Sequence, residues 1–306
     1  MYDVVIVGGG VAGLSAALLL GRGRRKVLVF DGGAPRNAPA HEAHSFFTRD
    51  GTPPLELLRI GREQLAAYDV EVRAGWVADA AREGEGFRVT AADGTEVTAR
   101  RLLLATGVVD VLPEIEGLRE RWGGAVFHCP YCHGWEVRGR PLAVLGRGDD
   151  AMHLVKLLRG WTDDLVLCTD GPAGLDDDAR AKLARHGVAL REEPVVRLEG
   201  PGGRLERIVF ASGEPLAREG ILLRPPQRPA SDLAERLGCE RLPGGPLVTD
   251  PFLQTTVPGV YVAGDGGLEE RVGDQGPPGE ALAPEPLGQV ARGALRGAEE
   301  DAFARE

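Results

Sequence analysis

With 306 residues, of which 43% are hydrophobic and 27% are charged, the chain is long enough for two globular domains with separate cores. The net charge is −10 and no cluster of basic residues occurs, which argues against nucleic acid as a partner. The sequence has no unbroken run of about 18 apolar residues and no basic N-terminal region with a cleavage site, so we expect no membrane partner, no signal peptide and a cytoplasmic location.

The N-terminal region predicts a strand, a glycine-rich turn, a helix and a second strand. Between the first strand and the helix, Gly8, Gly10 and Gly13 stand in the order GxGxxG, and Asp31 follows the second strand. The first glycine permits a tight turn, the second lets the backbone approach a pyrophosphate, and the third allows the helix to pack closely on the strand. The acidic residue stands where it can accept a hydrogen bond from a ribose hydroxyl. The expected elements are residues 2–7, 14–20 and 26–30.

The same order of elements occurs a second time in the chain. After the first unit, residues 70–101 show short alternating strands that lead to an apolar strand at 102–105. A second strand–turn–helix–strand unit begins near residue 141, and residues 187–218 and 221–223 repeat the alternating strands and the apolar strand. The sequence therefore predicts two dinucleotide-binding folds of related design.

The second unit contains a GxGxxA turn, formed by Gly146, Gly148 and Ala151, and Asp170 follows its second strand. A carboxylate at this position binds a ribose hydroxyl but repels a 2′-phosphate. No pair of arginines follows the strand. We therefore predict that this second site prefers NADH to NADPH, or binds no nicotinamide nucleotide.

Two of the chain's 4 cysteines stand three positions apart between these units. Cys129 and Cys132 are followed directly by His133. Two thiols at this spacing can form a disulfide with little movement of the backbone. An imidazole beside them can accept or donate the proton that a thiol loses or gains. The spacing indicates dithiol/disulfide redox chemistry.

Three other interpretations of these residues remain open. The order CxxCH is also that of a c-type haem attachment site. A zinc site would need two further ligands, and no second CxxC occurs. The two cysteines could also form a structural disulfide in a turn.

A last apolar strand is predicted at 259–263, and Gly264 and Asp265 follow it. An aspartate after Ala-Gly at a strand end can hold the hydroxyl groups of an extended flavin chain. The same residues also occur as an ordinary strand-to-turn connection, so this motif alone leaves both interpretations open.

In this order, the motifs resemble the low-molecular-weight thioredoxin reductase family, and the resemblance covers almost the whole chain. The stretch from Cys129 to Gly134, CPYCHG, is similar to a thioredoxin reductase-like subgroup that includes the gliotoxin- and holomycin-type dithiol oxidases. The resemblance implies an α/β flavoprotein with two Rossmann-like dinucleotide-binding domains, the second inserted in the first. It assigns FAD to residues 1–110 plus 243–306, places the CxxC and an NAD(P)-like fold in residues 111–242, and implies a homodimer.

The resemblance also implies roles for individual residues. Cys132 would lie nearest the flavin, Cys129 would exchange with the substrate, and His133 would be the acid/base. We expect no metal site. The residues that match the family's FAD contacts are Gly8, Gly10, Gly13, Asp31, Asn37, Thr106, Gly107, Gly264, Asp265, Gln289 and Val290. The residues that match its NAD(P) contacts are Gly146, Gly148, Ala151 and Asp170.

Departures from the family leave the direction of electron flow open. His133 stands where the family has an acidic residue, the basic cluster for a 2′-phosphate is absent, and residues 266–286 form an insertion. The enzyme would be a reductase of thioredoxin or a small disulfide, fed by NADPH, NADH or ferredoxin. Alternatively, it would be an oxygen-dependent oxidase of a small dithiol. A hypothesis from another class is a flavin redox sensor without turnover.

Overall fold

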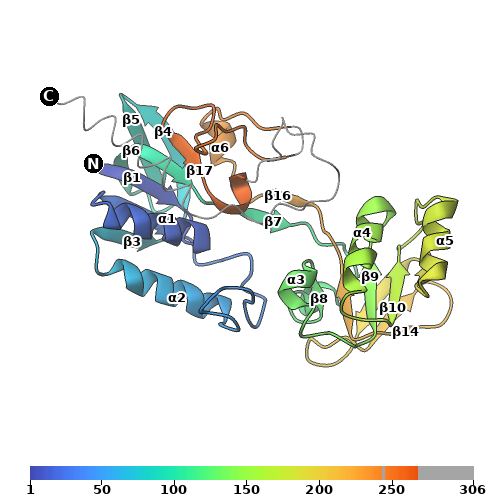
Figure 1. Ribbon diagram of the computed structural model, residues 1–306. Helices are drawn as coiled ribbons and strands as arrows, with labels where there is room; N and C mark the ends of the chain where they lie inside the picture. The colour runs from blue at the N-terminus through green and yellow to red at the C-terminus, as the bar shows by residue number, and fades with distance from the viewer. Residues whose placement is uncertain (243–244, 268–306) are drawn as a thin grey trace. The chain divides into compact units, whose positions relative to one another are not determined.

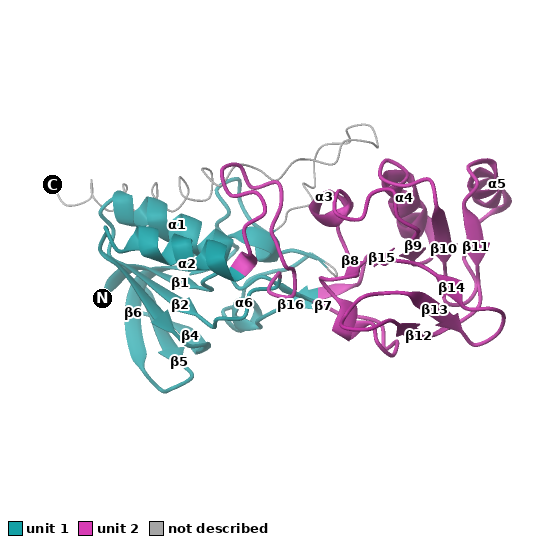
Figure 2. Ribbon diagram, turned by 90° about the horizontal axis from the view of Figure 1, so that it is seen from below, with its two compact units in different colours: residues 1–36, 55–109, 228–306 teal, residues 37–54, 110–227 magenta. Residues whose placement is uncertain are grey.

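The computed structural model describes residues 1–242 and 245–267 (Figure 1). Its contacts divide it into two compact units (Figure 2). Unit 1 consists of residues 1–36, 55–109 and those from 228 onward, and unit 2 consists of residues 37–54 and 110–227. The predicted fold class is confirmed, because both units are Rossmann-like α/β folds and one is inserted in the other. The assignment of FAD and NAD(P) to the predicted domains stays a prediction.

Unit 1 is built on a seven-stranded sheet. Its strands are β1 (Tyr2–Val7), β2 (Val27–Asp31), β3 (Val70–Ala74), β4 (Val77–Glu83), β5 (Gly86–Ala91), β6 (Glu96–Leu104) and β17 (Val260–Val262). The order is β3-β2-β1-β6-β5-β4, and β17 pairs with the second half of β6. The strands β3, β2, β1, β6 and β17 are parallel to one another, whereas β4 pairs antiparallel with β5 and β5 with β6. The parallel strands all end at one edge, and the predicted turn follows β1 there.

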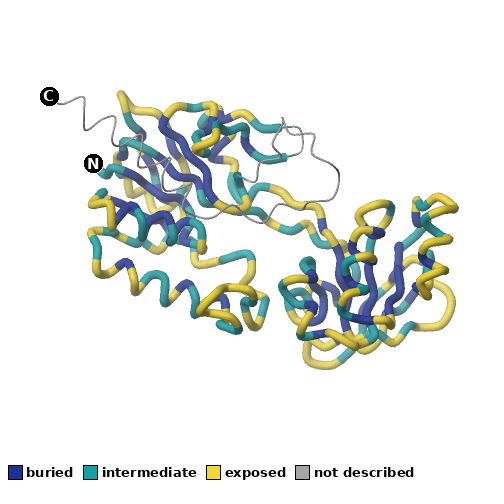
Figure 3. Tube along the Cα trace, in the orientation of Figure 1, coloured by how far each residue is buried: buried dark blue, intermediate teal, exposed yellow. Residues whose placement is uncertain are grey.

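The central strands β1, β2, β17 and the second half of β6 are buried, as Figure 3 shows. In β1, Val5 and Val7 pack into one hydrophobic cluster while Val4 and Ile6 pack into another. Such continuous apolar strands are typical of parallel sheets that are covered on both sides. The described helices of unit 1 are α1 (Val11–Arg22), α2 (Pro54–Leu65), α6 (Leu233–Arg236) and the 3₁₀ turn η2 (Gly264–Gly267). The second cluster includes side chains of α1 and α2. The helix α2 was not predicted from the sequence.

Unit 2 contains a five-stranded parallel sheet with the order β11-β10-β9-β15-β8. A separate antiparallel sheet has the order β12-β13-β14. The strands are β8 (Val126–Phe127), β9 (Leu142–Leu145), β10 (Leu165–Cys168), β11 (Ala189–Arg191), β12 (Val195–Glu199), β13 (Arg207–Phe210), β14 (Leu216–Ala217) and β15 (Gly220–Leu222). The helices are η1 (Arg119–Arg121), α3 (Pro130–His133), α4 (Gly148–Leu158) and α5 (Asp177–Arg185).

The predicted repeat is present in the structure. The unit β9–α4–β10 repeats β1–α1–β2, and in each case short antiparallel strands precede the return of the chain to the parallel sheet. Where the chain passes between the units, β7 (Val108–Asp110) pairs with β16 (Gln227–Pro229). Within residues 1–242 and 245–267, the structure has no helix of the length and apolarity that crossing a membrane requires.

The turn after β1 is packed so closely that side chains are excluded at two of its glycines. A Cβ atom on Gly13 would lie 1.9 Å from the carbonyl oxygen of Gly8. Gly8 has φ +117°, and its Cβ would lie 2.2 Å from the carbonyl oxygen of Ala105. These contacts bring the N-terminus of α1, the end of β1 and the end of β6 together, as the GxGxxG pattern predicts.

We expect Gly13→Ser to lower the free energy of unfolding by about 1–3 kcal/mol, because the new side chain overpacks the turn. The matched control is Gly10→Ser, since Gly10 has φ −73° and no atom of the described residues lies within 4 Å of its added Cβ. Serine is also a good N-cap for α1. Urea denaturation of flavin-free protein measures both changes, and equal stability of the two variants would contradict the packing described.

Candidate active site

The predicted flavin contacts of unit 1 meet at the carboxyl end of the parallel strands. The turn at Gly9 lies against Asp31, because an added Cβ would be 2.2 Å from the Cγ atom of that residue. An added Cβ on Gly264 would lie 2.9 Å from Cβ of Ala12, and one on Gly266 would lie 3.9 Å from the backbone nitrogen of Gly107. The structure therefore brings the glycine turn, Asp31, Thr106–Gly107 and Gly264–Asp265 together.

This arrangement fits a dinucleotide such as FAD. Among residues 1–242 and 245–267, no atom lies within 4 Å of a Cβ added to Gly10. The first turn of α1 contains no acidic residue. The positive end of the helix dipole and the free N–H groups therefore face a position that suits a pyrophosphate.

Asp31 is held by contacts that the sequence analysis missed. Its side chain is 13% exposed, its Oδ1 accepts the N–H of Gly33 at 2.8 Å, and its Oδ2 pairs with Nη1 of Arg62 at 2.9 Å. Arg62 comes from α2, which is distant in sequence from the turn. A carboxylate has about four acceptor positions, so two remain for ribose hydroxyls.

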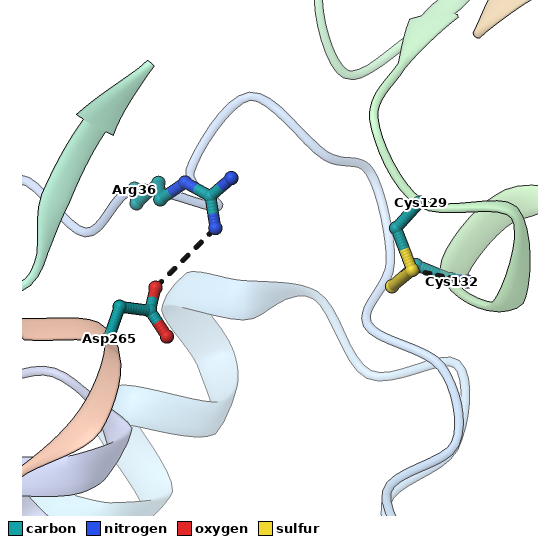
Figure 4. Close-up of a disulfide and its surroundings, with 4 residues drawn as sticks. All are labelled: Arg36, Cys129, Cys132 and Asp265. Atoms are coloured by element: carbon teal, nitrogen blue, oxygen red, sulfur yellow. Dashed lines mark hydrogen bonds and ion pairs between the residues drawn. A yellow bond between two sulfur atoms is a disulfide. The ribbon is translucent and has the colours of Figure 1, made fainter. Parts of the chain in front are cut away.

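Asp265 is held in a similar way. Nη1 of Arg36 lies 3.4 Å from its Oδ2 (Figure 4), a contact that was not predicted from the sequence. Of the other predicted flavin contacts, Asn37 is exposed and belongs to unit 2, so unit 1 does not contain it. Gln289 and Val290 lie outside the described residues.

The CxxC of unit 2 forms a disulfide (Figure 4). The Cα atoms of Cys129 and Cys132 lie 5.3 Å apart, and both residues are half-buried. Cys129 is the N-cap of α3 and Pro130 is the first residue of that helix, a position that proline favours. The backbone N–H of Cys132 donates to Sγ of Cys129 at 3.2 Å. When the disulfide is reduced, this donor stabilises a thiolate at Cys129.

His133 ends the same short helix and points its ring into the protein. The ring stacks on Phe127 with a centroid distance of 4.6 Å, and both ring nitrogens are buried without a hydrogen-bond partner among the described residues. Burial lowers the pKa of His133 to about 4, and the imidazoles of His128 and His44 add to this effect, while the carboxylate of Glu136 opposes it. The ring is therefore neutral at neutral pH, and its unprotonated nitrogen is free to accept a proton.

A carboxylate cluster ties the segment 37–54 to the disulfide region within unit 2. Nε2 of His44 lies 3.5 Å from Oε1 of Glu136 and 3.5 Å from Oε2 of Glu42. Nδ1 of the same ring lies 3.6 Å from Oδ1 of Asp50. This contact could not be predicted from local patterns, because His44 and Glu136 belong to segments far apart in the chain.

The second glycine turn also has the predicted geometry. Gly148 has φ +60°, and Cβ of Ala151 lies 3.4 Å from an added Cβ on Gly146. Asp170 follows β10 with φ +48°, and its Oδ1 accepts the N–H of Val195 at 2.8 Å. The side chain of Arg147, which the GxGxxA pattern leaves unspecified, lies between this turn and Asp170.

A glycine turn that fits FAD, a second dinucleotide fold and a half-buried disulfide beside that fold define a flavin-dependent disulfide oxidoreductase. The family described as "Pyridine nucleotide-disulphide oxidoreductase" matches residues 2–277. The chain therefore belongs to this family and is an enzyme of the thioredoxin reductase-like type. The resemblance inferred from the sequence is confirmed.

The similar proteins agree with this assignment. "Thioredoxin reductase sirT" of Leptosphaeria maculans is 31% identical over 283 residues, which cover 87% of this chain and 86% of that protein. The structure of a putative thioredoxin reductase TrxB from Bacillus anthracis has a TM-score of 0.89 and 31% identity, with all of both chains covered. The structure named HlmI has a TM-score of 0.87 and 39% identity over 99% of this chain and 95% of that one.

The buried, neutral His133 makes the folded state sensitive to acid. Because its pKa is about 4 in the folded protein and about 6.5 in an unfolded chain, the unfolded chain takes up this proton first as the pH falls. Stability that is complete above pH ~6.5 is therefore lost progressively towards pH ~4. We expect His133→Phe, which keeps a ring on Phe127, to lose less stability on acidification than wild type.

The comparison requires urea denaturation of both proteins at pH 7 and at pH 5. His153→Phe, which changes an exposed histidine on α4, should keep the acid dependence of wild type. An unchanged acid dependence in His133→Phe would show that the imidazole is not buried in its neutral form.

Proposed function

We propose that this enzyme passes an electron pair between FAD in unit 1 and a substrate dithiol or disulfide through Cys129 and Cys132. The observation that supports these roles is the N–H of Cys132, which donates to Sγ of Cys129 at 3.2 Å. This donor favours a thiolate at Cys129, and a thiolate is the form that exchanges with disulfides. Cys129 is therefore the exchanging thiol, and Cys132 is the cysteine that communicates with the flavin.

In the oxidative direction, a substrate thiolate attacks Sγ of Cys129, the Cys129–Cys132 bond breaks and Cys132 leaves as a thiolate. The second substrate thiolate then attacks its partner sulfur in the mixed disulfide, and Cys129 leaves with the electron pair of the broken bond. The substrate is now a disulfide and the enzyme a dithiol, so two electrons have been transferred. The reductive direction is the reverse of these steps.

His133 is the proposed acid/base for these exchanges. Its ring is neutral at neutral pH because burial lowers its pKa to about 4, and neither ring nitrogen has a partner among the described residues. The ring would take up a thiol proton only where a thiol of the reduced pair comes within hydrogen-bond reach, and its low pKa would make the imidazolium return that proton readily. General acid–base groups contribute roughly 10²–10⁴-fold to rates, so we expect a loss of this size in His133→Phe.

FAD supplies a carrier that takes up and releases the electron pair. The proposed contacts in unit 1 are Gly8, Gly10, Gly13, Asp31, Thr106, Gly107, Gly264 and Asp265, and Asn37, Gln289 and Val290 remain predicted contacts. The relatives are named thioredoxin reductases, which supports a thioredoxin-like protein or a small dithiol or disulfide as the substrate. We also propose a cytoplasmic homodimer, as the resemblance implies.

The test is anaerobic mixing of the purified flavoprotein with dithiothreitol, NADPH, NADH or reduced ferredoxin, while the flavin absorbance is followed. We expect the dithiol to bleach the flavin in wild type and in Cys168→Ser, because Cys168 is a buried, free cysteine in β10. Cys129→Ser should retain FAD but should not be bleached by the dithiol.

Flavin that stays oxidised with every donor would contradict catalysis and would favour a redox sensor. Bleaching of Cys129→Ser at the wild-type rate would mean that the disulfide is structural. Oxygen admitted to the dithiol-reduced enzyme then separates the directions, since only an oxidase returns rapidly to the oxidised spectrum.

A further inference from the structure

The two glycine turns of the protein differ at their middle position. The first turn reads Gly8-Gly9-Gly10 and the second reads Gly146-Arg147-Gly148. In the first turn, the backbone of Gly9 itself approaches Asp31, since an added Cβ would lie 2.2 Å from Cγ of that residue. No side chain of the turn stands between the glycines and the acidic residue there.

In the second turn, the side chain of Arg147 occupies this position. Its Nε donates to the carbonyl oxygen of Thr169 at 2.6 Å, and its Nη2 donates to the carbonyl oxygen of Asp170. Nη2 also lies 3.7 Å from Oδ2 of Asp170. The guanidinium is thus fixed against the end of β10, where the adenosine ribose of a bound dinucleotide would meet the acidic residue.

The helices that follow the two turns also differ, because the first turn of α4 is more acidic than the first turn of α1. The first turn of α4 contains Asp149 and Asp150, whereas the first turn of α1 contains no acidic residue. Carboxylates at a helix N-terminus interact favourably with the positive end of the helix dipole. They therefore compete with a phosphate that would bind there. Oδ1 of Asp150 pairs with Nη1 of Arg224 at 3.0 Å, so the carboxylate of Asp149 supplies most of the repulsion that a pyrophosphate would meet here.

The structure thus disagrees with the nucleotide that the family description implies for the second fold. We infer that Arg147, Asp149 and Asp150 close the turn of unit 2 to nicotinamide dinucleotides, so that this fold carries the redox disulfide without binding NADH or NADPH. Asp170 keeps its backbone contact to Val195 and serves as a structural residue. The inference concerns nucleotide binding alone. It also implies that electrons reach this enzyme from a donor without a nicotinamide, and this implication rests on the proposed function.

Binding of NADH and of NADPH to the full-length, FAD-loaded protein can be measured by isothermal titration calorimetry. For wild type we expect no binding tighter than about 1 mM. The triple variant Arg147→Ala/Asp149→Ala/Asp150→Ala should bind NADH at least about tenfold more tightly than wild type. It should prefer NADH to NADPH, because the freed carboxylate of Asp170 accepts a ribose hydroxyl and repels a 2′-phosphate.

The matched control is Arg159→Ala/Asp177→Ala/Asp178→Ala. It removes the same charges from unit 2, at the end of α4 and the first turn of α5, and should bind as wild type does. Micromolar binding of either nucleotide to wild type would overturn the inference. If the variant Arg147→Ala/Asp149→Ala/Asp150→Ala binds NADH no more tightly than wild type, the inference is also overturned, because these side chains then do not close the turn. Neither outcome depends on whether dithiols reduce the flavin, so failure of the proposed function is recognised separately.

Discussion

The close approach of Gly13 to the carbonyl oxygen of Gly8 is the constraint on which unit 1 depends. An added Cβ on Gly13 would lie 1.9 Å from that oxygen, so α1 can start beside the end of β1 only if this position has no side chain. That placement directs the helix dipole at an open turn beside Asp31 and brings the ends of β6 and β17 near it. The same scaffold is repeated in unit 2, but there Arg147, Asp149 and Asp150 add side chains and charges to the turn. One backbone design therefore serves the proposed cofactor site in unit 1 and, by our inference, a support for the disulfide in unit 2.

The chemistry of the disulfide follows from its position at the start of a short helix. The N–H of Cys132 favours negative charge on Cys129, whereas His133 is held neutral because its ring is buried against Phe127. Transfer of a proton from a thiol of the reduced pair to this imidazole would form a thiolate and an imidazolium, whose opposite charges compensate each other. The carboxylate of Glu136 contacts His44 and opposes the shift at His133, so the segment 37–54 contributes to the electrostatics of the site.

Much of the fold could be predicted from the sequence, because glycine spacing and apolar strands are local patterns. The two turns, the strands that flank them and the repeat of the antiparallel strands all lie where these patterns indicate. The contacts of Arg62 with Asp31 and of Arg36 with Asp265 could not be predicted, since each joins segments that are distant in sequence. Arg147 lies inside a recognised motif, but the motif leaves its position unspecified. Its effect depends on where its side chain turns, which only the folded structure reveals.

The central claim is that the Cys129–Cys132 disulfide and the flavin form one redox system. Anaerobic titration with dithionite, followed through the flavin spectrum and by counting the free thiols, tests this claim directly. A disulfide and a flavin each take up two electrons, so wild type should consume two two-electron equivalents and gain two thiols before the flavin is fully reduced. Cys129→Ser/Cys132→Ser should consume one equivalent. If wild type bleaches after one equivalent with its disulfide intact, the two centres do not exchange electrons and the account is wrong.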